Sequence, residues 1–229
     1  MPKMHTEAPG RRALLEAAIR LAANGRCINS LGLRELAREA GLNPNTFYRH
    51  FTSMEEMGLV MIEECAEQMH GPLRALRQSV AASLPLQPGE WGPQQAERGR
   101  QVSEATVKMY FDHALANQQV LMVGLRELHG PSPRLRAAVQ TIMQRQSREL
   151  AEDMASLGLL PKELPAAVLL SLASMISRNL FYQALDLIGA PEQYPQLHRS
   201  AVDQIIMLCT GAAFLQATGG LDAPAGPPG

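Results

Sequence analysis

The sequence is poor in aromatic residues, which make up 4% of the chain, and it has three cysteines among 229 residues. Val, Ile, Tyr and Phe are sparse whereas Ala, Leu and Met are abundant, so the composition favours helices over strands. Cys27, Cys65 and Cys209 are far apart and odd in number, which excludes a disulfide framework and a zinc-binding spacing. We therefore expect an all-α protein of a reducing cytoplasm, with no metal and no cofactor.

Membrane segments and enzyme motifs are also missing from the sequence. The first apolar run alternates with Arg and Glu, which excludes a signal peptide, and stretches such as residues 166–176 are too short to span a bilayer. There is no nucleophile elbow, phosphate-binding glycine loop or HExxH motif. Glu67 and His70 have the Glu-x-x-His spacing of a di-iron helix, but that site needs a second such motif. The sequence predicts that the protein is not an enzyme.

Charge is distributed unevenly, although the formal net charge is -1. Residues 1–53 contain eight Lys and Arg against four Asp and Glu, whereas residues 54–229 contain thirteen against eighteen. A basic end on an acidic body is typical of a protein whose N-terminal part binds a polyanion. An excess of four charges also arises by chance, so this pattern needs support from a motif.

Apolar residues recur with helical spacing along most of the chain, and no segment alternates with period two for long enough to predict a strand. Gly25 and Gly41 follow the first two helices, and Pro44 opens the third. Helices are expected over residues 11–24, 33–40, 43–50, 54–83, 103–130, 132–157, 165–188 and 191–218. The Pro- and Gly-rich residues 85–101 predict a loop, and residues 1–9 a mobile arm.

The segment LGLRELAREAGLNPNTFYRHF, residues 31–51, predicts two short helices joined by a tight turn. Leu36, Phe47 and Phe51 supply an apolar interior, and Gly41 lies where the turn needs a permissive backbone. The second helix exposes amides, hydroxyls and cations, the groups that contact base edges and phosphates in DNA. A pair of helices with an ordinary polar surface is the alternative, but it does not account for the Tyr-Arg-His-Phe ending and the basic charge together.

A recognition helix presents its N-terminal residues to the major groove of DNA. Asn45 and Thr46 are therefore the expected base readers, and the residues that follow are expected to contact the phosphate backbone. Arg34, at the start of the preceding helix, is expected to reach a phosphate across the groove. The complete set of expected DNA-binding residues is Arg34, Asn43, Asn45, Thr46, Tyr48, Arg49 and His50.

These motifs resemble the N-terminal domain of the TetR family of bacterial regulators, over RRALLEAAIRLAANG, LRELAREAGLNPNTFYRHF and the acidic TSMEEMG. The resemblance implies a cytoplasmic repressor that binds palindromic double-stranded DNA as a homodimer and has a cavity for a small-molecule effector. Two positions depart from the family. Gly32 stands where a Ser or Thr usually contacts a phosphate, and Met54 where Lys is common, so we expect fewer phosphate contacts.

We therefore expect about nine helices in two domains. Residues 1–53 form a three-helix helix-turn-helix DNA-binding domain, and residues 54–218 form a C-terminal helical bundle for ligand binding and dimerisation. Residues 219–229 are rich in Gly, Pro and Ala and are expected to be a disordered tail.

A narrower resemblance, over SLGLREL, TFYRHF, EEMGL and LRELHGPSPRLRAAV, is to the bacterial repressors of unsaturated fatty-acid biosynthesis genes. This branch implies sensing of long-chain acyl-CoA and control of fatty-acid metabolism. Two alternatives remain open. One is an efflux or metabolite-responsive regulator of the same fold, and the other is a helical ligand-binding protein without a DNA function.

Twelve methionines are many for this length, and Met lines adaptable apolar pockets well. Polar groups inside a helical body would orient the head of a ligand. The expected ligand-binding residues are Met109, His113, Met122, Arg126, Met143, Met175, Arg178 and Asn179. Ordinary core packing is the alternative for each Met, and an ion pair with Glu127 is the alternative for Arg126.

The dimer is expected to use the last two helices, where small and apolar residues such as Ala173, Ser177, Ile205 and Ala212 permit close packing. Burial within a single chain is the alternative for these residues.

Overall fold

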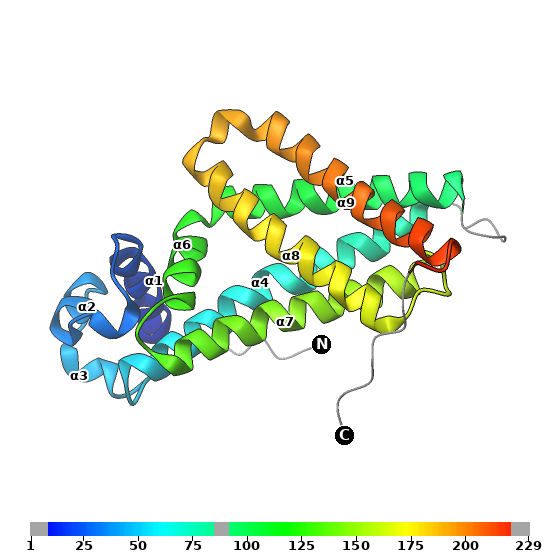
Figure 1. Cartoon of the computed structure of the whole chain (residues 1–229). Coiled ribbons are helices and arrows are strands. Elements are labelled where there is room, and N and C mark those ends of the chain that lie inside the picture. Colours follow the sequence, from blue (N-terminus) through cyan, green and yellow to red (C-terminus); the bar gives the residue numbers. More distant parts are fainter. Residues whose placement is uncertain (1–8, 85–91, 221–229) are drawn as a thin grey trace, which may run out of the picture. The chain divides into compact units, whose positions relative to one another are not determined.

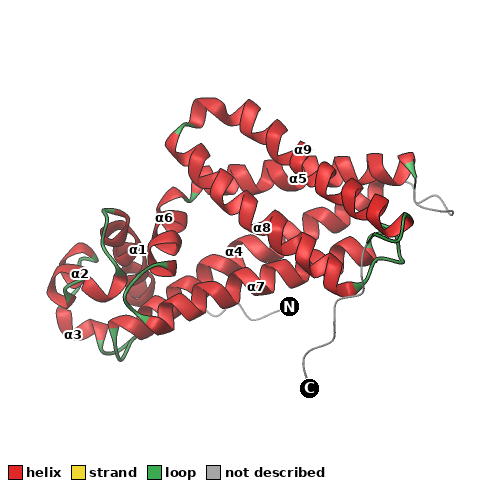
Figure 2. Cartoon of the chain, in the orientation of Figure 1, coloured by secondary structure: helices red, strands yellow, loops and turns green. Residues whose placement is uncertain are grey.

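The computed structural model describes residues 9–84 and 92–220, and all regular elements within them are helical (Figure 2). The described chain has nine α-helices and no strand, as the sequence predicts, and two short 3-10 helices that the sequence did not predict. The expected N-terminal arm, the first part of the expected loop and most of the expected tail lie outside these residues.

Internal contacts divide the chain into two compact units. Unit 1 consists of the described residues up to Glu67 and of Asn117–Ile142, and unit 2 of Gln68–Ala116 and the residues from Met143 onward. Because α4 (Met54–Ser83) and α7 (Pro133–Ser156) each have one end in either unit, this division differs from the predicted boundary at residue 53.

Unit 1 contains α1 (Pro9–Ala23), α2 (Leu33–Glu39), α3 (Pro44–Phe47) and α6 (Gln118–Leu128), coloured from blue to green in Figure 1. The turns between these helices follow from local chemistry. Gly25 and Gly41 have φ values of 96° and 68°, in the left-handed region that glycine tolerates. Asn43 caps α3 by accepting a hydrogen bond from the Asn45 N–H at 2.9 Å, and Pro44 occupies the first helical position.

The third helix ends at Phe47, earlier than the predicted residue 50. The Phe51 N–H donates to the Phe47 carbonyl at 3.0 Å, so residues 48–50 form a hydrogen-bonded turn directly after the helix. A short 3-10 helix, η1 (Ile28–Ser30), connects α1 to α2 and was not predicted.

The start of α4 is capped by side chains. Ser53 Oγ accepts from the Glu56 N–H at 3.1 Å, and the Glu56 carboxylate accepts from the Thr52 N–H at 2.6 Å. These reciprocal bonds satisfy donors that the first helical turn leaves free. Hydrogen bonds from the Thr52 hydroxyl and from the Thr52 N–H lower the pKa of Glu56. Pro72 lies within α4 without ending it.

Unit 2 is built on α5 (Pro93–Ala116), α8 (Ala166–Gly189) and α9 (Tyr194–Ala217), which pack against one another. Figure 1 shows α8 and α9 as a hairpin, whose connection contains the 3-10 helix η2 (Pro191–Gln193). The segment Pro191–Ala217 is long and apolar enough to cross a membrane by composition, but in the structure it packs on α5 and α8.

Two helix boundaries in the middle of the chain were predicted wrongly. The helix expected over residues 103–130 is two helices, because α5 ends at Ala116 and α6 starts after Asn117, whose φ of -125° and ψ of 37° break the helix. The expected loop over residues 85–101 ends earlier, because α5 begins at Pro93 in the first helical turn that proline favours.

Candidate nucleic-acid interface and apolar cavity

The surface of α2 and α3 carries most of the residues predicted to bind DNA. Phe47 and Phe51 are buried beneath it, and Tyr48 and Arg49 between them are exposed. Tyr48 is 65% exposed although it is aromatic, and its ring contacts Phe47 edge-on with centroids 5.5 Å apart. Asn45 and Arg49 are also exposed. An aromatic ring held outward beside an amide and a guanidinium can contact nucleic acid without refolding the unit.

Several arginines of unit 1 form ion pairs with carboxylates. Arg20 lies 2.8 Å from Glu39, and Arg26 bonds both oxygens of Glu35 at 2.8 Å, which lowers the pKa of Glu35. These pairs tie α2 to α1 and to the connection between them. Their cations are therefore structural and are poor candidates for phosphate binding.

Three arginines of α2 and the turn after α3 differ from these. Arg34, Arg38 and Arg49 are exposed and form no ion pair or side-chain hydrogen bond within the described residues. Arg38 was not predicted from the sequence, although its position one turn after Arg34 on the same short helix could have indicated it. Together they give this surface three cations that are not held in ion pairs and that a polyanion can contact.

The remaining predicted DNA-binding residues are partly used inside the unit. Thr46 is half-buried, and Asn43 uses its side-chain oxygen to cap α3. His50 is half-buried, and a Cβ added to Gly10 would lie 3.0 Å from His50 Nε2. His50 therefore packs closely on the first turn of α1, where a glycine gives it room.

Two adjacent residues of α6 hold the connection between α1 and α2. Arg126 donates a hydrogen bond to the Ala22 carbonyl near the end of α1. Glu127 is buried, and its Oε1 accepts from the Ile28 N–H at 2.6 Å. Burial raises the pKa of Glu127, while the Ile28 N–H and the neighbouring Arg126 act in the opposite direction. Sequence patterns gave no indication that Glu127 is buried.

Unit 2 encloses an apolar cavity of about 70 Å³ between α4, α5, α7, α8 and α9. Its wall is mainly aliphatic, and the residues that represent the five helices are Leu73, Val102, Met154, Leu180 and Ile206. Arg77 of α4 is the one charged residue on the wall as far as the structure describes it. An apolar cavity with a small number of polar groups is the usual form of a small-molecule site.

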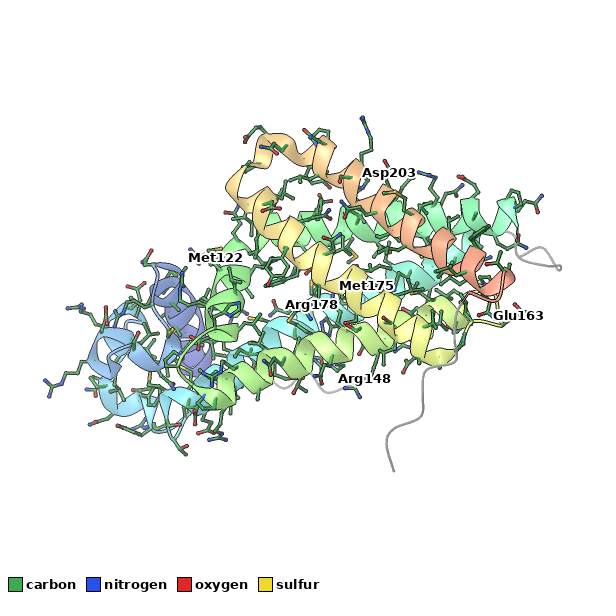
Figure 3. The ribbon with its side chains drawn as sticks, in the orientation of Figure 1. Met122, Arg148, Glu163, Met175, Arg178 and Asp203 are labelled. Atoms are coloured by element: carbon green, nitrogen blue, oxygen red, sulfur yellow. The ribbon has the colours of Figure 1, made fainter. Side chains whose placement is uncertain are left out.

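None of the eight residues predicted to bind a ligand lines this cavity. Met122 and Arg126 belong to unit 1, whereas the other six belong to unit 2. Met175 and Arg178, labelled in Figure 3, line a shallow pocket on the outer face of α8. Asn179 is also exposed and donates to Gln204 of α9.

The other three residues of unit 2, Met109, His113 and Met143, are half-buried at other positions on α5 and α7. Burial lowers the pKa of His113, so its imidazole is mostly neutral near pH 7. The structure thus does not bring the eight residues together at one site. Helical periodicity identifies apolar faces, but it does not say which helices enclose a cavity.

Residues 14–59 match the sequence model of the tetR family of bacterial regulatory proteins. The solved structures similar to this chain include the fatty acid degradation regulator FadR from Bacillus halodurans, with a TM-score of 0.63 and 18% identity over 90% of this chain and 97% of that one. They also include a transcriptional regulator of the TerR/AcrR family from Aquifex aeolicus VF5, with a TM-score of 0.61 and 17% identity over 87% and 99%.

A third similar structure is the transcriptional regulator FadR from Bacillus subtilis in complex with stearoyl-CoA, with a TM-score of 0.56 and 14% identity over 91% of this chain and 98% of that one. At these identities the similarity shows a shared fold. The matched family consists of regulators and not of enzymes. The described chain therefore shares the fold of these solved regulators, and its residues 14–59 match the N-terminal domain of the tetR family.

Proposed function

We propose that this protein is a homodimeric repressor that binds a palindromic operator through α2 and α3 and responds to an acyl ligand bound in unit 2. The DNA-binding part of this proposal is carried by one observation, the exposure of the side chains of Asn45, Tyr48 and Arg49. Arg34 and Arg38 of α2 are exposed beside them. These side chains are exposed, and the three arginines have no carboxylate partner in the described chain. The neighbouring arginines, by contrast, are paired.

The expected role of each of these residues follows from the chemistry of DNA. Phosphate contacts by Arg34, Arg38 and Arg49 supply affinity that is independent of sequence and depends on salt. Asn45 and Thr46, at the start of α3, supply the choice of sequence through base edges in the major groove. Asn43 keeps the recognition helix in place by capping it, and His50 packs on the first turn of α1.

The dimer is supported by apolar side chains exposed on α8 and α9. Met207 and Phe214 are 64% and 65% exposed and lie seven residues apart, two turns along one face of α9. On α8, Leu170 and Met175 are exposed as well. Large apolar side chains clustered outside a helical bundle are typical of a protein–protein interface. A twofold dimer would place two recognition helices about 34–36 Å apart, matching successive major grooves.

Several of the residues first expected at this interface are buried within the chain itself, whereas Leu170, which was also expected there, is 42% exposed. Ala173, Ser177, Ile205 and Ala212 have little exposure in a single chain, which favours the alternative of intrachain packing for them. The proposed dimer surface is the adjacent exposed face of the same two helices.

The acyl ligand is supported by the apolar cavity and by the similarity to FadR in complex with stearoyl-CoA. It also agrees with the resemblance of the N-terminal motifs to repressors of unsaturated fatty-acid biosynthesis genes. The helices α4 and α7 have residues in both units. A ligand that binds more tightly to one arrangement of these helices shifts the protein toward that arrangement, and this shift can change the affinity for the operator. The change is limited by the difference between the ligand's affinities for the two arrangements.

The test is fluorescence anisotropy on labelled DNA from upstream of the protein's own gene and of fatty-acid desaturation genes. Binding is measured at two salt concentrations, with and without saturated and unsaturated acyl-CoA, and a shuffled DNA of the same composition is the control. We expect salt-dependent binding that prefers one fragment over the shuffled DNA and that changes unequally with the two acyl-CoA classes.

The outcomes separate the parts of the proposal. Specific binding that acyl-CoA leaves unchanged would remove the lipid and leave a regulator of another metabolite. Equal binding to all fragments calls for selection from random DNA. If that selection also yields no preferred sequence, the regulator function is wrong and a ligand-binding protein without DNA function becomes the better description.

A further inference from the structure

Glu127 of α6 is a buried carboxyl group with only one of its two oxygens in use. The residue is 1% exposed, and its Oε1 accepts from the Ile28 N–H at 2.6 Å. Its Oε2 has no hydrogen-bond partner within the described residues, and it lies against Gly130, where an added Cβ would be 3.1 Å away. A buried charge on such an oxygen is costly, because the hydration it loses is not replaced. Binding a proton removes that cost.

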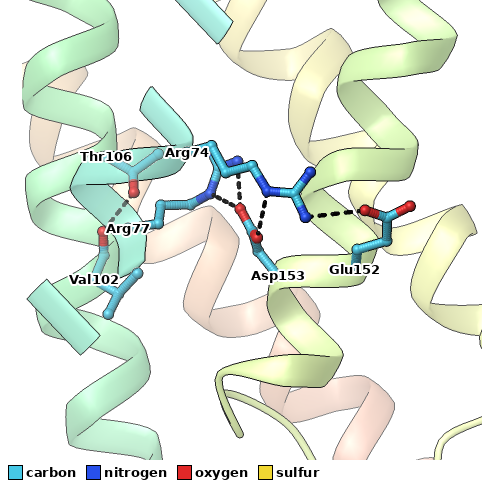
Figure 4. Close-up of polar contacts among 6 residues, drawn as sticks. All are labelled: Arg74, Arg77, Val102, Thr106, Glu152 and Asp153. Atoms are coloured by element: carbon cyan, nitrogen blue, oxygen red, sulfur yellow. Dashed lines mark hydrogen bonds and ion pairs between the residues drawn. The ribbon is translucent and has the colours of Figure 1, made fainter. Parts of the chain in front are cut away.

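A second buried carboxyl group, Asp153 of α7, has the support that Glu127 lacks. Asp153 is fully buried, and Figure 4 shows it between Arg77 and Arg74 of α4. Arg77 Nη2 lies 2.6 Å from Asp153 Oδ2, and Arg74 Nε lies 3.3 Å from Asp153 Oδ1. Two cations compensate the desolvation of a buried carboxylate in this way. In the part of the chain that the structure describes, no ion pair joins Glu127 to a cation.

The charged groups on the elements around Glu127 have other partners. Its neighbour Arg126 donates to the Ala22 carbonyl, and Arg136 of α7 donates to the Gly130 carbonyl. His129, at the end of α6, is exposed. The arginines of α1, of the connection after it and of the first turn of α7 form ion pairs, namely Arg11 with Glu64, Arg12 with Glu16, Arg20 with Glu39, Arg26 with Glu35 and Arg134 with Glu55.

The titratable groups at this contact agree with the geometry. Burial raises the pKa of Glu127, although the Ile28 N–H and Arg126 act in the opposite direction. Cys27, the residue before Ile28, also has a raised pKa, because it is partly buried and lies near Glu127. The thiol is therefore uncharged near pH 7 and does not compensate or add to the charge of Glu127.

The contact that Glu127 makes lies on the chain segment that leads into the DNA-binding helices. Ile28 starts η1, which connects α1 to α2, and α2 carries the exposed Arg34 and Arg38. Arg126 holds the other end of the same connection through the Ala22 carbonyl. A connection that is held in place leaves less disorder to be lost when α2 and α3 bind DNA, and this favours binding.

We propose that Glu127 is a positioning residue for DNA binding, whose protonated carboxyl group holds the connection between α1 and α2 and whose ionisation releases this connection and weakens operator binding. The inference rests on the proposed DNA-binding function and adds a regulation to it. The sign follows from linkage. The arrangement with Glu127 buried binds the proton more tightly than an arrangement in which Glu127 reaches water, so raising the pH through the folded pKa disfavours the buried arrangement.

The test compares wild type with Glu127→Gln, because an amide keeps the oxygen acceptor for Ile28 and cannot ionise. Anisotropy gives the operator Kd of the full-length proteins across the pH range. The two should bind equally near pH 5.5, and wild type should bind about three- to tenfold more weakly than the variant near pH 8, since one unit of pKa difference between two arrangements changes their ratio about tenfold. Taking the ratio of the two Kd values cancels titrations that both proteins share, including that of His50.

The matched control is Glu163→Gln, at an exposed glutamate of unit 2 labelled in Figure 3. It removes the same charge, and its Kd ratio to wild type should not change with pH. A ratio for Glu127→Gln that stays constant across pH would mean that Glu127 has only a structural role, and this would overturn the inference. An equal change in Glu163→Gln would also overturn it, because net charge would then explain the effect.

Infrared difference spectra of wild type and Glu127→Gln observe the proton directly. A band of a protonated carboxyl group should be present in wild type near pH 5.5 and should fade over the pH range in which the two Kd values diverge. Absence of this band at the acidic end would contradict the inference.

The same titrations separate this inference from the proposed function. Specific operator binding with a constant Kd ratio leaves the regulator function standing and removes only the role of Glu127. If neither protein binds any DNA at any pH, the regulator function is wrong and the inference fails with it.

Discussion

Arg49 is an exposed arginine after the recognition helix, and it has no ion pair in the part of the chain that the structure describes. If it contacts a phosphate, Arg49→Ala should weaken binding to operator and to shuffled DNA alike. It should also reduce the slope of log affinity against log salt by about one. Asn45→Ala should instead reduce the preference for the operator, because a base contact carries about 1–3 kcal/mol of discrimination.

The matched control for both is Arg148→Ala, an exposed arginine of α7 in unit 2, labelled in Figure 3. It removes the same charge outside the helix-turn-helix. Anisotropy titrations at several salt concentrations provide the measurement. A salt slope that changes as much in Arg148→Ala as in Arg49→Ala would mean that net charge, and not the α3 surface, governs binding.

Glu127 is a buried carboxylate of α6 that holds the Ile28 N–H, and burial raises its pKa in the folded protein. A carboxyl group whose pKa is higher in the folded than in the unfolded protein contributes free energy of unfolding that is fully present at a pH below the unfolded pKa, near 4.5. This contribution is lost as the pH rises through the folded pKa. Glu127→Gln keeps an oxygen acceptor for Ile28 and removes this titration. The free energy of unfolding of the variant relative to wild type should therefore increase from acidic to neutral pH.

The measurement is urea unfolding of both proteins at several pH values. Comparing the two proteins cancels the contributions of Glu35, Glu55 and Glu56, whose pKa values are lowered and whose effect on stability has the opposite sign. A difference between variant and wild type that stays constant across pH would show that Glu127 does not titrate abnormally. Glu127→Ala, which leaves the Ile28 N–H without an acceptor, should cost about 1–3 kcal/mol.

At the scale of elements, α2 starts without a side-chain cap. Gly32 is its N-cap residue with φ -79° and ψ 131°, a conformation that any residue adopts, and an added Cβ would meet nothing closer than 3.7 Å. Glu35 already stands at the third helical position, so Gly32→Ser completes a capping box. We expect the free energy of unfolding to rise by a few tenths to about 1 kcal/mol.

The control for this prediction is Gly32→Ala, which restricts the unfolded chain to a similar degree but offers no oxygen to the helix. Thermal unfolding followed by circular dichroism compares the three proteins. If the alanine and serine variants are equally stable, the gain comes from the unfolded state and α2 does not use the added cap.

Elements with local end signals were predicted correctly from the sequence. Gly41 and Asn43 determine the turn before α3 through a positive φ and a side-chain cap, and both effects are visible in a few residues of sequence. The break at Asn117 has no such signal. Gly99 suggested a loop, but it lies inside α5, where it lines the cavity and an added Cβ would lie 3.7 Å from the Leu159 carbonyl.

At the scale of the whole molecule, the cavity and the α6 contacts depend on residues far apart in the chain. Arg77 and Asp153 are 76 residues apart, and Ile28 and Glu127 are 99 residues apart. Periodicity within one helix does not reveal which charged residue another helix will cover. For this reason the helices α2 and α3 and most of their exposed side chains could be predicted from residues 31–51, whereas the cavity wall could not.

Dimerisation through the exposed apolar face of α8 and α9, as proposed, would let the protein bind both halves of a palindromic operator. If two chains meet there, Phe214→Asp places a charge in the interface of each chain. Burying it opposite its own copy is unfavourable, because a twofold axis brings like charges together. We expect a shift from dimer to monomer, with little change in the fold because Phe214 is 65% exposed in the single chain.

Light scattering after size exclusion measures the mass, and circular dichroism checks the fold. Ala155→Asp adds the same charge at an exposed position of α7 and should remain dimeric. Operator affinity should fall with Phe214→Asp, because one recognition helix contacts one half-site and the second half-site no longer binds in the same event. If Phe214→Asp stays dimeric at the same concentration, the interface lies elsewhere. A spacing of about 34–36 Å between the two recognition helices, about one helical turn of DNA, would then have to arise from a dimer formed by another pair of helices.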